Sequence, residues 1–514
     1  MEYDIEIRKI NDTWMKIDCR EIYMEMEISD RFSFLIPDHR NHPQVKRRHW
    51  DGIKRLYNRT YKRMYVGLLV ELVKFIKKQE YSLYIDPSLF PHSKIEKNDI
   101  ENIIKEVIKP YDEKGLPINV YDYQIEAIYR QLNTNRSVCL AATSAGKSLI
   151  FYIAIRIYQM LDEFEGKPII LIVPSKLLVE QMYNDFCVYS NNDVKNWNPA
   201  IHCQKIDGDY SPIVKKQIII STWQSLKNIS NHIIQNAGAI FVDEVHTANG
   251  PVLTKHLENA VNVPIRHGMT GTLDDEVLHE LQLTGLFGPI KRIVASKEII
   301  DQGRATPIHI KTVILDYDER TKLQLHNVVS SFEDKKKRYA TEVDFINKLE
   351  SRKKFIIDTA KHLKGNTIIL FDRVDSYGVP LYEEMKKIHK NTFLIVGEVG
   401  MEEREDIKNM LENIDDGIVF ATTKILSTGV SIKRLHNMIF ISSTKAKIKL
   451  LQSIGRLMRL HETKKRANFI DIVDKLDYKG IQNYVLGHVY KRVKYYSQEG
   501  HPIKFITINL KENA

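Results

Sequence analysis

The chain has 514 residues, with 76 Lys and Arg against 66 Asp and Glu, and 43% of its residues are hydrophobic. That length is too great for a single domain, and the composition is typical of globular proteins with sizeable buried cores. No apolar run approaches the ~20 residues of a transmembrane helix, and the charged N-terminus MEYDIEIRKI lacks the apolar region of a signal peptide. Four widely spaced cysteines without a CxxC pair argue against a zinc site or a disulfide framework. We expect a soluble, cytoplasmic protein whose net charge of +10 favours a polyanionic partner.

The first hundred residues are expected to form a small α+β module, with an amphipathic helix near 67–80. Within it, the segment 46–65 reads KRRHWDGIKRLYNRTYKRMY, in which eight Lys and Arg are opposed only by Asp51. One interpretation is a solvated hairpin that turns at Asp51-Gly52 and places Trp50 in the small core. The other is a surface that binds nucleic-acid phosphates through basic and aromatic side chains. For the second we single out Arg47, Arg48, Trp50, Lys54, Arg55 and Arg59.

From residue 137 onward, short apolar, β-branched runs alternate with helical patterns, which predicts parallel sheets covered by helices on both faces. The first series of runs lies at 137–143, 168–175, 217–223, 239–245 and 265–272. The second lies at 366–372, 392–398, 417–423, 437–443 and 467–474. We therefore predict an α/β protein with two RecA-like domains, at 101–305 and 306–514, after the module at 1–100. DQGRATP (301–307) is expected to be a hinge, followed by a helix near 340–363.

A phosphate site is predicted where CLAATSAGKSLI passes from a strand through a small-residue loop into a helix. Backbone N–H groups and a helix N-terminus would cradle phosphates there, Lys147 would neutralise the β and γ oxygens, and Ser148 would ligate Mg²⁺. Ala141 stands where the first glycine of such loops is usual. Later, AIFVDEVH ends a strand in adjacent carboxylates, of which Asp243 would hold the Mg²⁺ and Glu244 would activate the attacking water. ATP and Mg²⁺ are the expected cofactors.

The DEVH tetrad and its surroundings resemble superfamily 2 helicases and translocases of the DExH kind. Further stretches carry the resemblance: YQ (123–124), VPSKLLVEQ (173–181), TWQS (222–225), MTGT (269–272), ILFDRVDSYG (369–378), ATTKILSTGVSI (421–432) and QSIGRLMR (452–459). The resemblance implies that Arg456 and Arg459, three apart on one helical face, sense the γ-phosphate. It implies nucleotide contacts by Gln124, Thr143, Ser144, Ala145, Gly146, Lys147, Ser148 and Gly429. Sequence-independent contacts to the nucleic-acid strand would come from Ser175, Lys176, Thr222, Trp223, Gln224, Arg373, Thr428 and Ser431.

A narrower resemblance is to the UvsW-type helicases of T4-like and related large phages. It rests on HWDGIKRLY (49–57), LFGPIKRIVASKEIIDQGRATP (286–307) and KIKLLQSIGRLMR (447–459), besides the general motifs. This resemblance implies ATP-driven unwinding and branch migration of forks, D-loops and Holliday-type junctions in phage replication, recombination and repair. The setting would be the host bacterial cytoplasm, with DNA as partner, an RNA–DNA hybrid as a second possibility, and a monomer favoured.

Three alternatives remain open at this stage. The chain could be an RNA or R-loop helicase, the motor subunit of a restriction-type complex, or a DNA-binding scaffold that retains an ATPase fold. Near the C-terminus, VLGHVYKRVKYYSQEG (485–500) either lies on nucleic acid through Lys491, Arg492 and Lys494 or is an amphipathic helix that closes the fold. We expect His246 to link motifs by hydrogen bonds rather than to bind a metal, and Cys139 to be a buried small hydrophobe.

Overall fold

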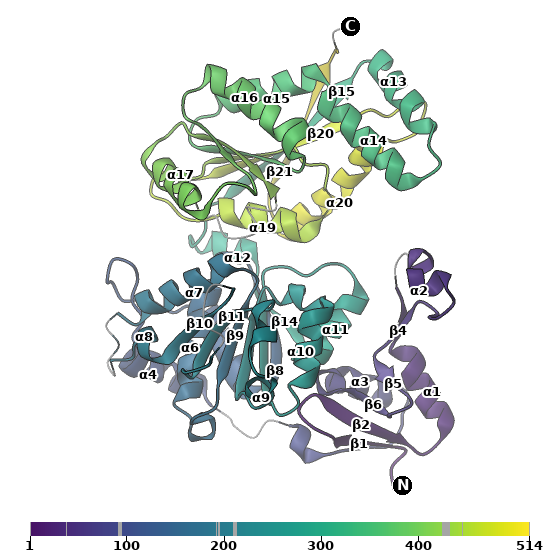
Figure 1. The fold of residues 1–514 in the computed structure, drawn as a ribbon, viewed down its shortest axis with the longest axis vertical. Helices are drawn as coiled ribbons and strands as arrows, with labels where there is room; N and C mark the ends of the chain where they lie inside the picture. The colour runs from purple at the N-terminus through teal and green to yellow at the C-terminus, as the bar shows by residue number, and fades with distance from the viewer. Residues whose placement is uncertain are drawn as a thin grey trace. The chain divides into compact units, whose positions relative to one another are not determined.

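The structure is a computed structural model that describes residues 2–36, 39–90, 95–191, 193, 196–208, 213–423, 432–444 and 446–512. By its internal contacts the chain divides into two compact units (Figure 1). Unit 1 takes in residues 1–141 and 145–294, and unit 2 takes in 295–514 with 142–144. Among the described residues no helix is long and apolar enough to span a membrane. The division falls between Val294 and Ala295, so the expected hinge at 301–307 belongs to unit 2.

Unit 1 begins with an N-terminal module, residues 2–90, which is built on a mixed five-stranded sheet of order β5-β6-β2-β1-β7. Its strands are β1 (Ile5–Lys9), β2 (Trp14–Cys19), β5 (Tyr57–Asn58), β6 (Arg63–Tyr65) and β7 (Leu83–Ile85). The helices α1 (Ile22–Arg31), η2 (Val66–Leu68) and α3 (Leu69–Lys78) accompany it. The helix expected near 67–80 is thus confirmed as α3, with Leu69, Leu72 and Ile76 buried at helical spacing.

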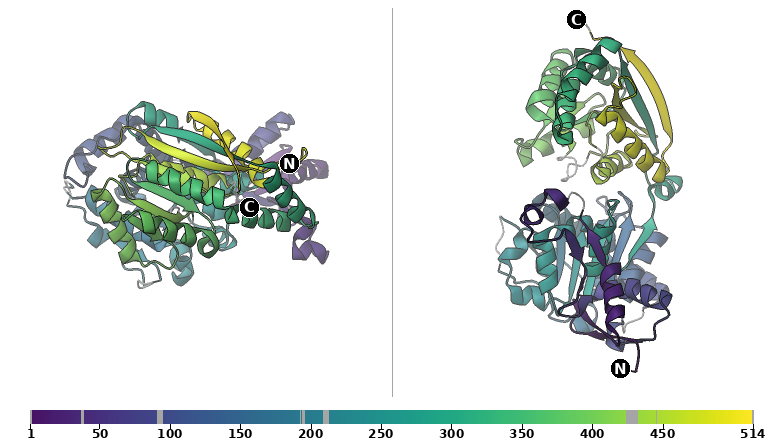
Figure 2. Two further views of the ribbon diagram at one scale, coloured as in Figure 1. Left: turned by 90° about the horizontal axis from the view of Figure 1, so that it is seen from above. Right: turned by 90° about the vertical axis from the view of Figure 1, so that its right-hand side faces the viewer.

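A small antiparallel hairpin extends from this module, and we call residues 33–55 the basic arm. It consists of β3 (Ser33–Leu35), η1 (His39–Asn41), α2 (Pro43–Lys46) and β4 (Ile53–Arg55), with β3 paired to β4. In Figure 2, as in Figure 1, α2 lies at the end of the module remote from the N-terminus.

The rest of unit 1 is a seven-stranded, all-parallel sheet of order β10-β11-β9-β12-β13-β8-β14. Its strands are β8 (Arg136–Ala141), β9 (Ile169–Val173), β10 (Cys203–Ile206), β11 (Ile218–Thr222), β12 (Ala239–Asp243), β13 (Ile265–Thr270) and β14 (Ile290–Val294). Its helices are α4 (Lys97–Ile103), the π-helix η4 (Ile104–Ile108), α5 (Asp122–Asn133), α6 (Lys147–Gln159), α7 (Lys176–Tyr189), α8 (Pro199–His202), α9 (Asn231–Gln235), η7 (Val245–Asn249), α10 (Pro251–Asn259) and α11 (Val277–Phe287).

Unit 2 holds a second all-parallel seven-stranded sheet, of order β17-β18-β16-β19-β20-β15-β21. The strands are β15 (Ile308–Tyr317), β16 (Thr367–Phe371), β17 (Thr392–Ile395), β18 (Ile418–Thr422), β19 (Asn437–Phe440), β20 (Ala467–Lys475) and β21 (Ile503–Leu510). The helices are α12 (Ser296–Asp301), α13 (Glu319–Ser330), α14 (Lys335–Lys348), α15 (Glu350–His362), η8 (Val374–Gly378), α16 (Val379–Ile388), α17 (Met401–Asn413), α19 (Lys447–Leu457) and α20 (Tyr484–Gln498). Numbered from the first strand of each sheet, both sheets follow the order 3-4-2-5-6-1-7, so the two RecA-like domains share one topology.

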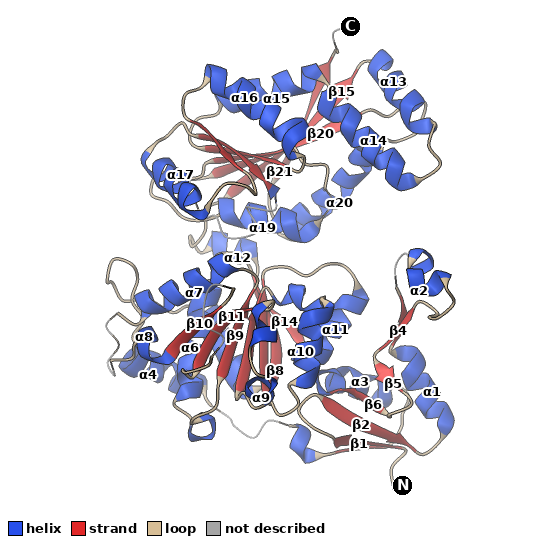
Figure 3. Cartoon of the chain, viewed as in Figure 1, coloured by secondary structure: helices blue, strands red, loops and turns tan. Residues whose placement is uncertain are grey.

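Each sheet is covered on both faces, as its fully apolar strands require (Figure 3). In unit 2, Ile439 and Ile470 pack in the core formed with α15 and α16, whereas their neighbours Phe440 and Phe469 point to the opposite face, where Phe469 meets Tyr496 of α20. This alternation follows from the two-residue period of a strand. The predicted fold class is therefore confirmed.

Several elements differ from the sequence prediction. The strands β10, β14, β15 and β21 were not predicted from the sequence. Of these, β10 and β14 are the two edge strands of the first sheet, and β21 is an edge strand of the second. The single helix expected near 340–363 is wrong: Leu349, with φ −66° and ψ 116°, separates α14 from α15. All four cysteines are free thiols, and Cys139 is buried in β8 as expected.

Candidate functional site: an ATP site and a nucleic-acid surface

The phosphate loop lies between β8 and α6, at the carboxyl edge of the first sheet. Two of its residues, Ser144 (φ 71°) and Gly146 (φ 75°), have left-handed backbone conformations, and Gly146 is the N-cap of α6. A Cβ atom at Gly146 would lie 2.5 Å from Nε2 of Gln124, in addition to the strain of its φ. The loop therefore needs glycine at this position, and its turn directs the N-terminus of a thirteen-residue helix toward the loop, which suits phosphate binding.

The two side chains that open α6 already have partners in the same unit. Nζ of Lys147 lies 3.4 Å from Oε1 of Glu244. Oγ of Ser148 lies 2.9 Å from the hydroxyl of Tyr189, at the end of α7. The structure thus brings the P-loop lysine and the expected water-activating glutamate together, because β8 and β12 are separated in the sheet only by β13.

The pKa values of the two adjacent carboxyl groups of the DEVH tetrad are shifted in opposite directions. Burial, reinforced by the neighbouring Glu244, raises the pKa of Asp243 to about 6. Burial alone would also raise the pKa of Glu244, but the Lys147 ammonium and hydrogen bonds from His246 and Thr270 outweigh it and hold that pKa well below its usual range. Oδ1 of Asp243 is buried without a hydrogen-bond partner among the described residues. A buried carboxylate oxygen with an unused lone pair is suited to a hard cation such as Mg²⁺.

Glu244 is further connected to the MTGT segment through a compact network. The hydroxyl of Thr270 donates to Oε2 of Glu244 at 3.0 Å, and Nδ1 of His246 lies 2.8 Å from the same hydroxyl. Nδ1 of His246 is also 3.3 Å from Glu244 Oε2. Glu244 itself has φ 48°, a left-handed conformation that is rare outside glycine and that points to a functional constraint at this position. As expected, His246 links two motifs by hydrogen bonds.

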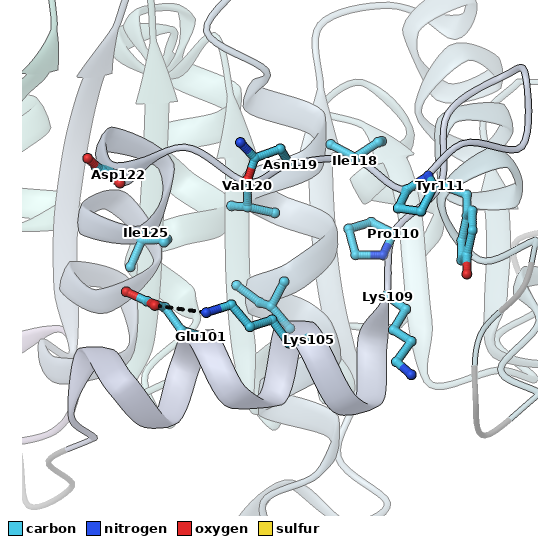
Figure 4. Close-up of a pocket in the computed structure, with 12 residues that line it drawn as sticks. Glu101, Lys105, Lys109, Pro110, Tyr111, Ile118, Asn119, Val120, Asp122 and Ile125 are labelled. Atoms are coloured by element: carbon cyan, nitrogen blue, oxygen red, sulfur yellow. Dashed lines mark hydrogen bonds and ion pairs between the residues drawn. The ribbon is translucent and has the colours of Figure 1, made fainter.

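Gln124, predicted to contact the nucleotide, is 3% exposed and lies in the first turn of α5. Its Nε2 donates to the carbonyl of Ala145 at 2.9 Å, and its Oε1 accepts from the backbone N–H of Tyr121 at 3.0 Å. The side chain therefore joins α5 to the phosphate loop. Its neighbours Asp122 and Ile125 line a pocket of about 420 Å³ between η4 and the segment 117–122 (Figure 4). Lys105 and Lys109 give that pocket a basic rim, with an ion pair between Lys105 and Glu101.

The expected strand-contacting residues of unit 1 follow the adjacent strands β9 and β11. Ser175 is the N-cap of α7, and Lys176 beside it is exposed. Thr222 is buried and donates to Oγ of Ser225 at 3.0 Å, Trp223 packs against the core, and Gln224 is exposed. Because carboxyl ends of parallel strands meet at one edge, these loops share an edge with the ATP site but lie on the half formed by β9 and β11.

The basic arm presents most of its charge to solvent. Arg47, Arg48, Lys54 and Arg55 are exposed, as is Arg59 after the arm. Gly52 has φ +78°, but β4 after it pairs with β3 and not with the residues directly before Asp51, so the expected hairpin turning at Asp51-Gly52 is wrong. Asp51 pairs with Arg55 at 2.6 Å. Trp50 is half-buried and donates from Nε1 to the carbonyl of Ile53, with the ring of His42 5.2 Å away. Its indole stabilises the arm itself and is not part of the module's main core, contrary to the first interpretation.

In unit 2, the segment expected to reach the γ-phosphate forms α19. Arg456 is in the last turn, but the helix ends at Leu457, so Arg459 lies beyond it, and the expectation of one helical face is wrong. The carbonyl of Arg459 accepts from Oγ1 of Thr306, and that of Met458 accepts from the N–H of Thr306. Arg373 is exposed and lies 3.4 Å from Asp344. Thr428, Gly429 and Ser431 lie outside the described residues.

Three side chains of this machinery were not singled out from the sequence. The first is Tyr189, described above. The second is Asp372 after β16, which accepts from Thr423 at 2.6 Å and from Ser442 and thereby joins the ends of the neighbouring strands β18, β16 and β19. Lys464 is 5% exposed, donates to the carbonyls of Leu457 and Lys433, and so caps the C-terminus of α19. Burial lowers the pKa of Lys464 to about 8. Only a strand-end position could have indicated Asp372, and the sequence carries no signal for Lys464.

The C-terminal segment 485–500 forms α20, and its arginine has a structural role. Arg492 is fully buried, and it donates from Nε to Oδ2 and from Nη2 to Oδ1 of Asp471, each at 2.9 Å. The hydroxyl of Tyr496 donates to the same carboxylate. Lys491 and Lys494 are exposed. The helix therefore closes the fold through Arg492 and Tyr496, and a phosphate contact by Arg492 is excluded.

Comparison with protein families gives three matches along the chain. The model of the UvsW DNA helicase N-terminal domain matches residues 4–86, that of the type III restriction enzyme res subunit matches 117–275, and that of the helicase conserved C-terminal domain matches 347–461.

Relatives and solved structures agree with these matches. The ATP-dependent DNA helicase uvsW of Enterobacteria phage T4 is 29% identical over 526 aligned residues, covering 99% of this chain and 100% of that protein. A putative helicase of a Sulfolobus islandicus filamentous virus is 23% identical over 73% of this chain and 68% of its own. The crystal structure of T4 UvsW aligns over 98% of this chain and 99% of that chain, with 26% identity and a TM-score of 0.51. A fragment of a putative type I restriction HsdR subunit from Vibrio vulnificus, 17% identical over 82% of this chain and 73% of that one, shares the fold with a TM-score of 0.55.

Two RecA-like sheets of one topology, with a P-loop, a DEVH carboxylate pair and its threonine partner in the first, define a superfamily 2 helicase of the DExH kind. Within that class, the chain resembles the UvsW type, because its N-terminal module matches the UvsW model and its whole length is similar to T4 uvsW.

Proposed function

We propose that the chain is an ATP-dependent DNA helicase that remodels branched DNA, by fork regression, branch migration of four-way junctions and unwinding of D-loops. The observation that carries this proposal is that one chain joins an ATP-hydrolysing motor to a module of UvsW type bearing an exposed basic arm. A motor that grips one strand without regard to sequence needs a further surface to select a branch, and the arm supplies charge for duplex phosphates. The res-subunit model, in contrast, matches only the motor.

At the ATP site, the residues of unit 1 have distinct roles. The N-terminus of α6 and Lys147 would bind the phosphates, while Ser148 and Asp243 would hold the Mg²⁺ that enters with the nucleotide. When bound with the nucleotide, the Mg²⁺ would neutralise phosphate charge. Glu244, kept ionised by Lys147 and Thr270, would orient and deprotonate water. The thiol of Cys139 and the ring of His267, buried in the sheet, take no part.

The DNA contacts follow as part of the same proposal. Ser175, Lys176 and Gln224 would bind phosphates of the tracked strand, together with Arg373 of unit 2. The basic arm would bind duplex arms through Arg47, Arg48, Lys54 and Arg55. We also propose that the chain has three domains, divided at residues 100 and 305, and that Arg456 and Arg459 sense the γ-phosphate. If the chain is encoded by a phage, it would act in the host bacterial cytoplasm.

The test is ATP-dependent unwinding of a fork, a four-way junction, a DNA duplex and an RNA duplex of matched sequence, side by side. We expect the fork and junction to be processed fastest, DNA to stimulate ATP hydrolysis, and Lys147→Ala to abolish both activities. Equal rates on RNA and DNA, without preference for branches, would contradict the proposal and favour an RNA helicase. Stimulated hydrolysis without strand separation would favour a double-strand translocase such as a restriction motor.

A further inference from the structure

Two buried arginines stand side by side at the amino ends of the strands that carry the ATP-site motifs. Arg136 opens β8, which leads into the phosphate loop, and Arg266 lies near the start of β13, which ends in Thr270. They are register partners on these neighbouring strands, and they are 6% and 0% exposed. Since an arginine is rarely buried so completely without a paired carboxylate, other acceptors must compensate the two guanidinium groups.

Those partners are mostly main-chain oxygens, drawn from both the motor domain and the N-terminal module. Arg266 donates to the carbonyls of Leu257 and Ala260, at the end of α10, and through Nη2 to Oγ1 of Thr13 at 2.7 Å. Arg136 donates to the carbonyl of Leu286, at the end of α11, at 2.8 Å, and to that of Asp12. Helix C-termini bring partial negative charge to both guanidinium groups. The turn between β1 and β2, which holds Asp12 and Thr13, completes the set of acceptors.

The same helices contact the module at two further places. The hydroxyl of Tyr65 donates to Oε1 of Glu258 on α10 at 2.5 Å, and its ring stacks on Trp14 at 4.4 Å. The guanidinium of Arg63 on β6 lies 4.4 Å from the centre of the Trp14 ring. Gly67 packs directly on α11, where a Cβ atom would lie 2.1 Å from the carbonyl oxygen of Thr284. Side chains of the module and of α10 and α11 form one continuous apolar core.

Helix α10 follows the DEVH segment after η7, and α11 follows MTGT after a short loop. The module is therefore fixed to the parts of the motor that surround the hydrolysis site, and it is not tethered by its linker alone. We propose that Arg136 and Arg266 are positioning residues for branch remodelling: they attach the module rigidly to the first motor domain, so that duplex arms bound by the basic arm are held against the body that carries the ATP site. The proposal rests on the proposed function, and concerns how ATP hydrolysis is converted into strand separation.

The test compares two variants that loosen the attachment from opposite sides. Gly67→Ala wedges the module away from α11 without altering the motor's own core, and Arg266→Met removes the donors on the motor side. Gly487→Ala on α20 in unit 2 is the matched control, because a Cβ atom there meets nothing closer than 3.9 Å. For each, ATP hydrolysis with single-stranded DNA, junction binding, and junction unwinding per ATP hydrolysed are measured. Hydrogen exchange of segments 5–19 and 277–287 reports the attachment itself, whether or not the wild type unwinds DNA.

We expect Gly67→Ala and Arg266→Met to raise exchange in both segments and to retain single-strand-stimulated hydrolysis. Unwinding per ATP should fall about tenfold or more, because misplacement by about an ångström is costly at a positioned site. Unchanged unwinding per ATP in Gly67→Ala overturns the inference whatever Arg266→Met does, and so does an equal loss in Gly487→Ala. A wild-type chain that separates no branched DNA contradicts the proposed function instead, and increased exchange in Gly67→Ala would then still support the attachment.

Discussion

The ammonium group of Lys147 lies 3.4 Å from Oε1 of Glu244, and the other oxygen of that carboxylate accepts a hydrogen bond from Thr270. One carboxylate is thus held between the phosphate loop and the MTGT segment. In the proposed mechanism the lysine has two uses, since it would bind phosphate and it keeps Glu244 ionised.

This geometry predicts that Lys147 and Glu244 variants fail in different ways. Glu244→Gln should lower kcat for ATP hydrolysis by about 10²- to 10⁴-fold, the usual contribution of a general base, while ATP binding is nearly retained. Lys147→Ala should lose both ATP hydrolysis and ATP binding, because the phosphates would lack the lysine cation. Steady-state kinetics with a nucleotide-binding assay separates the two results. If the Glu244→Gln variant hydrolysed ATP at the wild-type rate, Glu244 would not be the general base.

The second prediction concerns the hydroxyl of Thr270. Thr270→Val keeps the shape but removes the hydrogen bonds to Glu244 and His246, so we expect kcat to fall about tenfold, consistent with the loss of a charge-assisted hydrogen bond of ~1.5 kcal/mol or more. Thr312→Val in β15 is the matched control, since its buried Oγ1 has no hydrogen-bond partner among the described residues. Equal ATPase rates in the two variants would show that the network has no part in hydrolysis.

A third prediction tests the basic arm by charge removal. Arg47→Gln, Arg48→Gln and Lys54→Gln together should weaken junction binding and lower the slope of log K against log salt by about 2 to 3, or ~0.9 for each phosphate that is no longer neutralised. The control removes three exposed lysines of α3 on the same module, Lys74, Lys77 and Lys78. Hydrolysis without DNA should be unchanged in both triple variants. If both lose junction affinity equally, only net charge matters, and the arm is not the binding surface.

The strands of both series, the phosphate loop and the DEVH site could be predicted because each depends on local order: an apolar run, then small or acidic residues at its end. The roles of Arg136 and Arg266 could not be predicted, because a charged residue at a strand start is usually solvated, and their acceptors come from the docked module and from the ends of α10 and α11. The break at Leu349 also lacks a glycine or proline to indicate it. In each case a tertiary contact overrides a local pattern, as expected where burial decides the outcome.

A fourth prediction uses His267, the neighbour of Arg266 on β13. Burial lowers the pKa of His267 to about 3, and its two ring nitrogens face the hydroxyls of Ser137 and Tyr158. Because the folded pKa lies below the usual 6.5, the unfolded chain binds more protons between pH 6.5 and 3, and stability falls as pH falls. From pH 7 to 5 this residue should cost about 2 kcal/mol, at ~1.4 kcal/mol per pH unit below 6.5.

His267→Phe should remove this part of the acid sensitivity. The measurement is the urea midpoint of the first unfolding transition at pH 7 and pH 5, compared between variant and wild type. His279→Phe is a control, since that imidazole is at the surface and 35% exposed. If the wild type and His267→Phe lose stability equally between the two pH values, His267 is not held neutral in the folded chain.

The last prediction distinguishes the structural role of α20 from a role in DNA binding. Arg492→Met leaves the Asp471 carboxylate buried without its cation, so unit 2 should lose about 3 to 5 kcal/mol of stability, the usual cost of breaking a buried pair. Lys491→Met and Lys494→Met, on the exposed face of the same helix, should change stability by no more than about 0.5 kcal/mol. Thermal or urea unfolding measures the difference, and DNA affinity is determined on the same samples. Lower affinity in the two lysine variants, at unchanged stability, would place the exposed face of α20 on the nucleic acid, whereas unchanged affinity would restrict this helix to closing the fold through Arg492 and Tyr496.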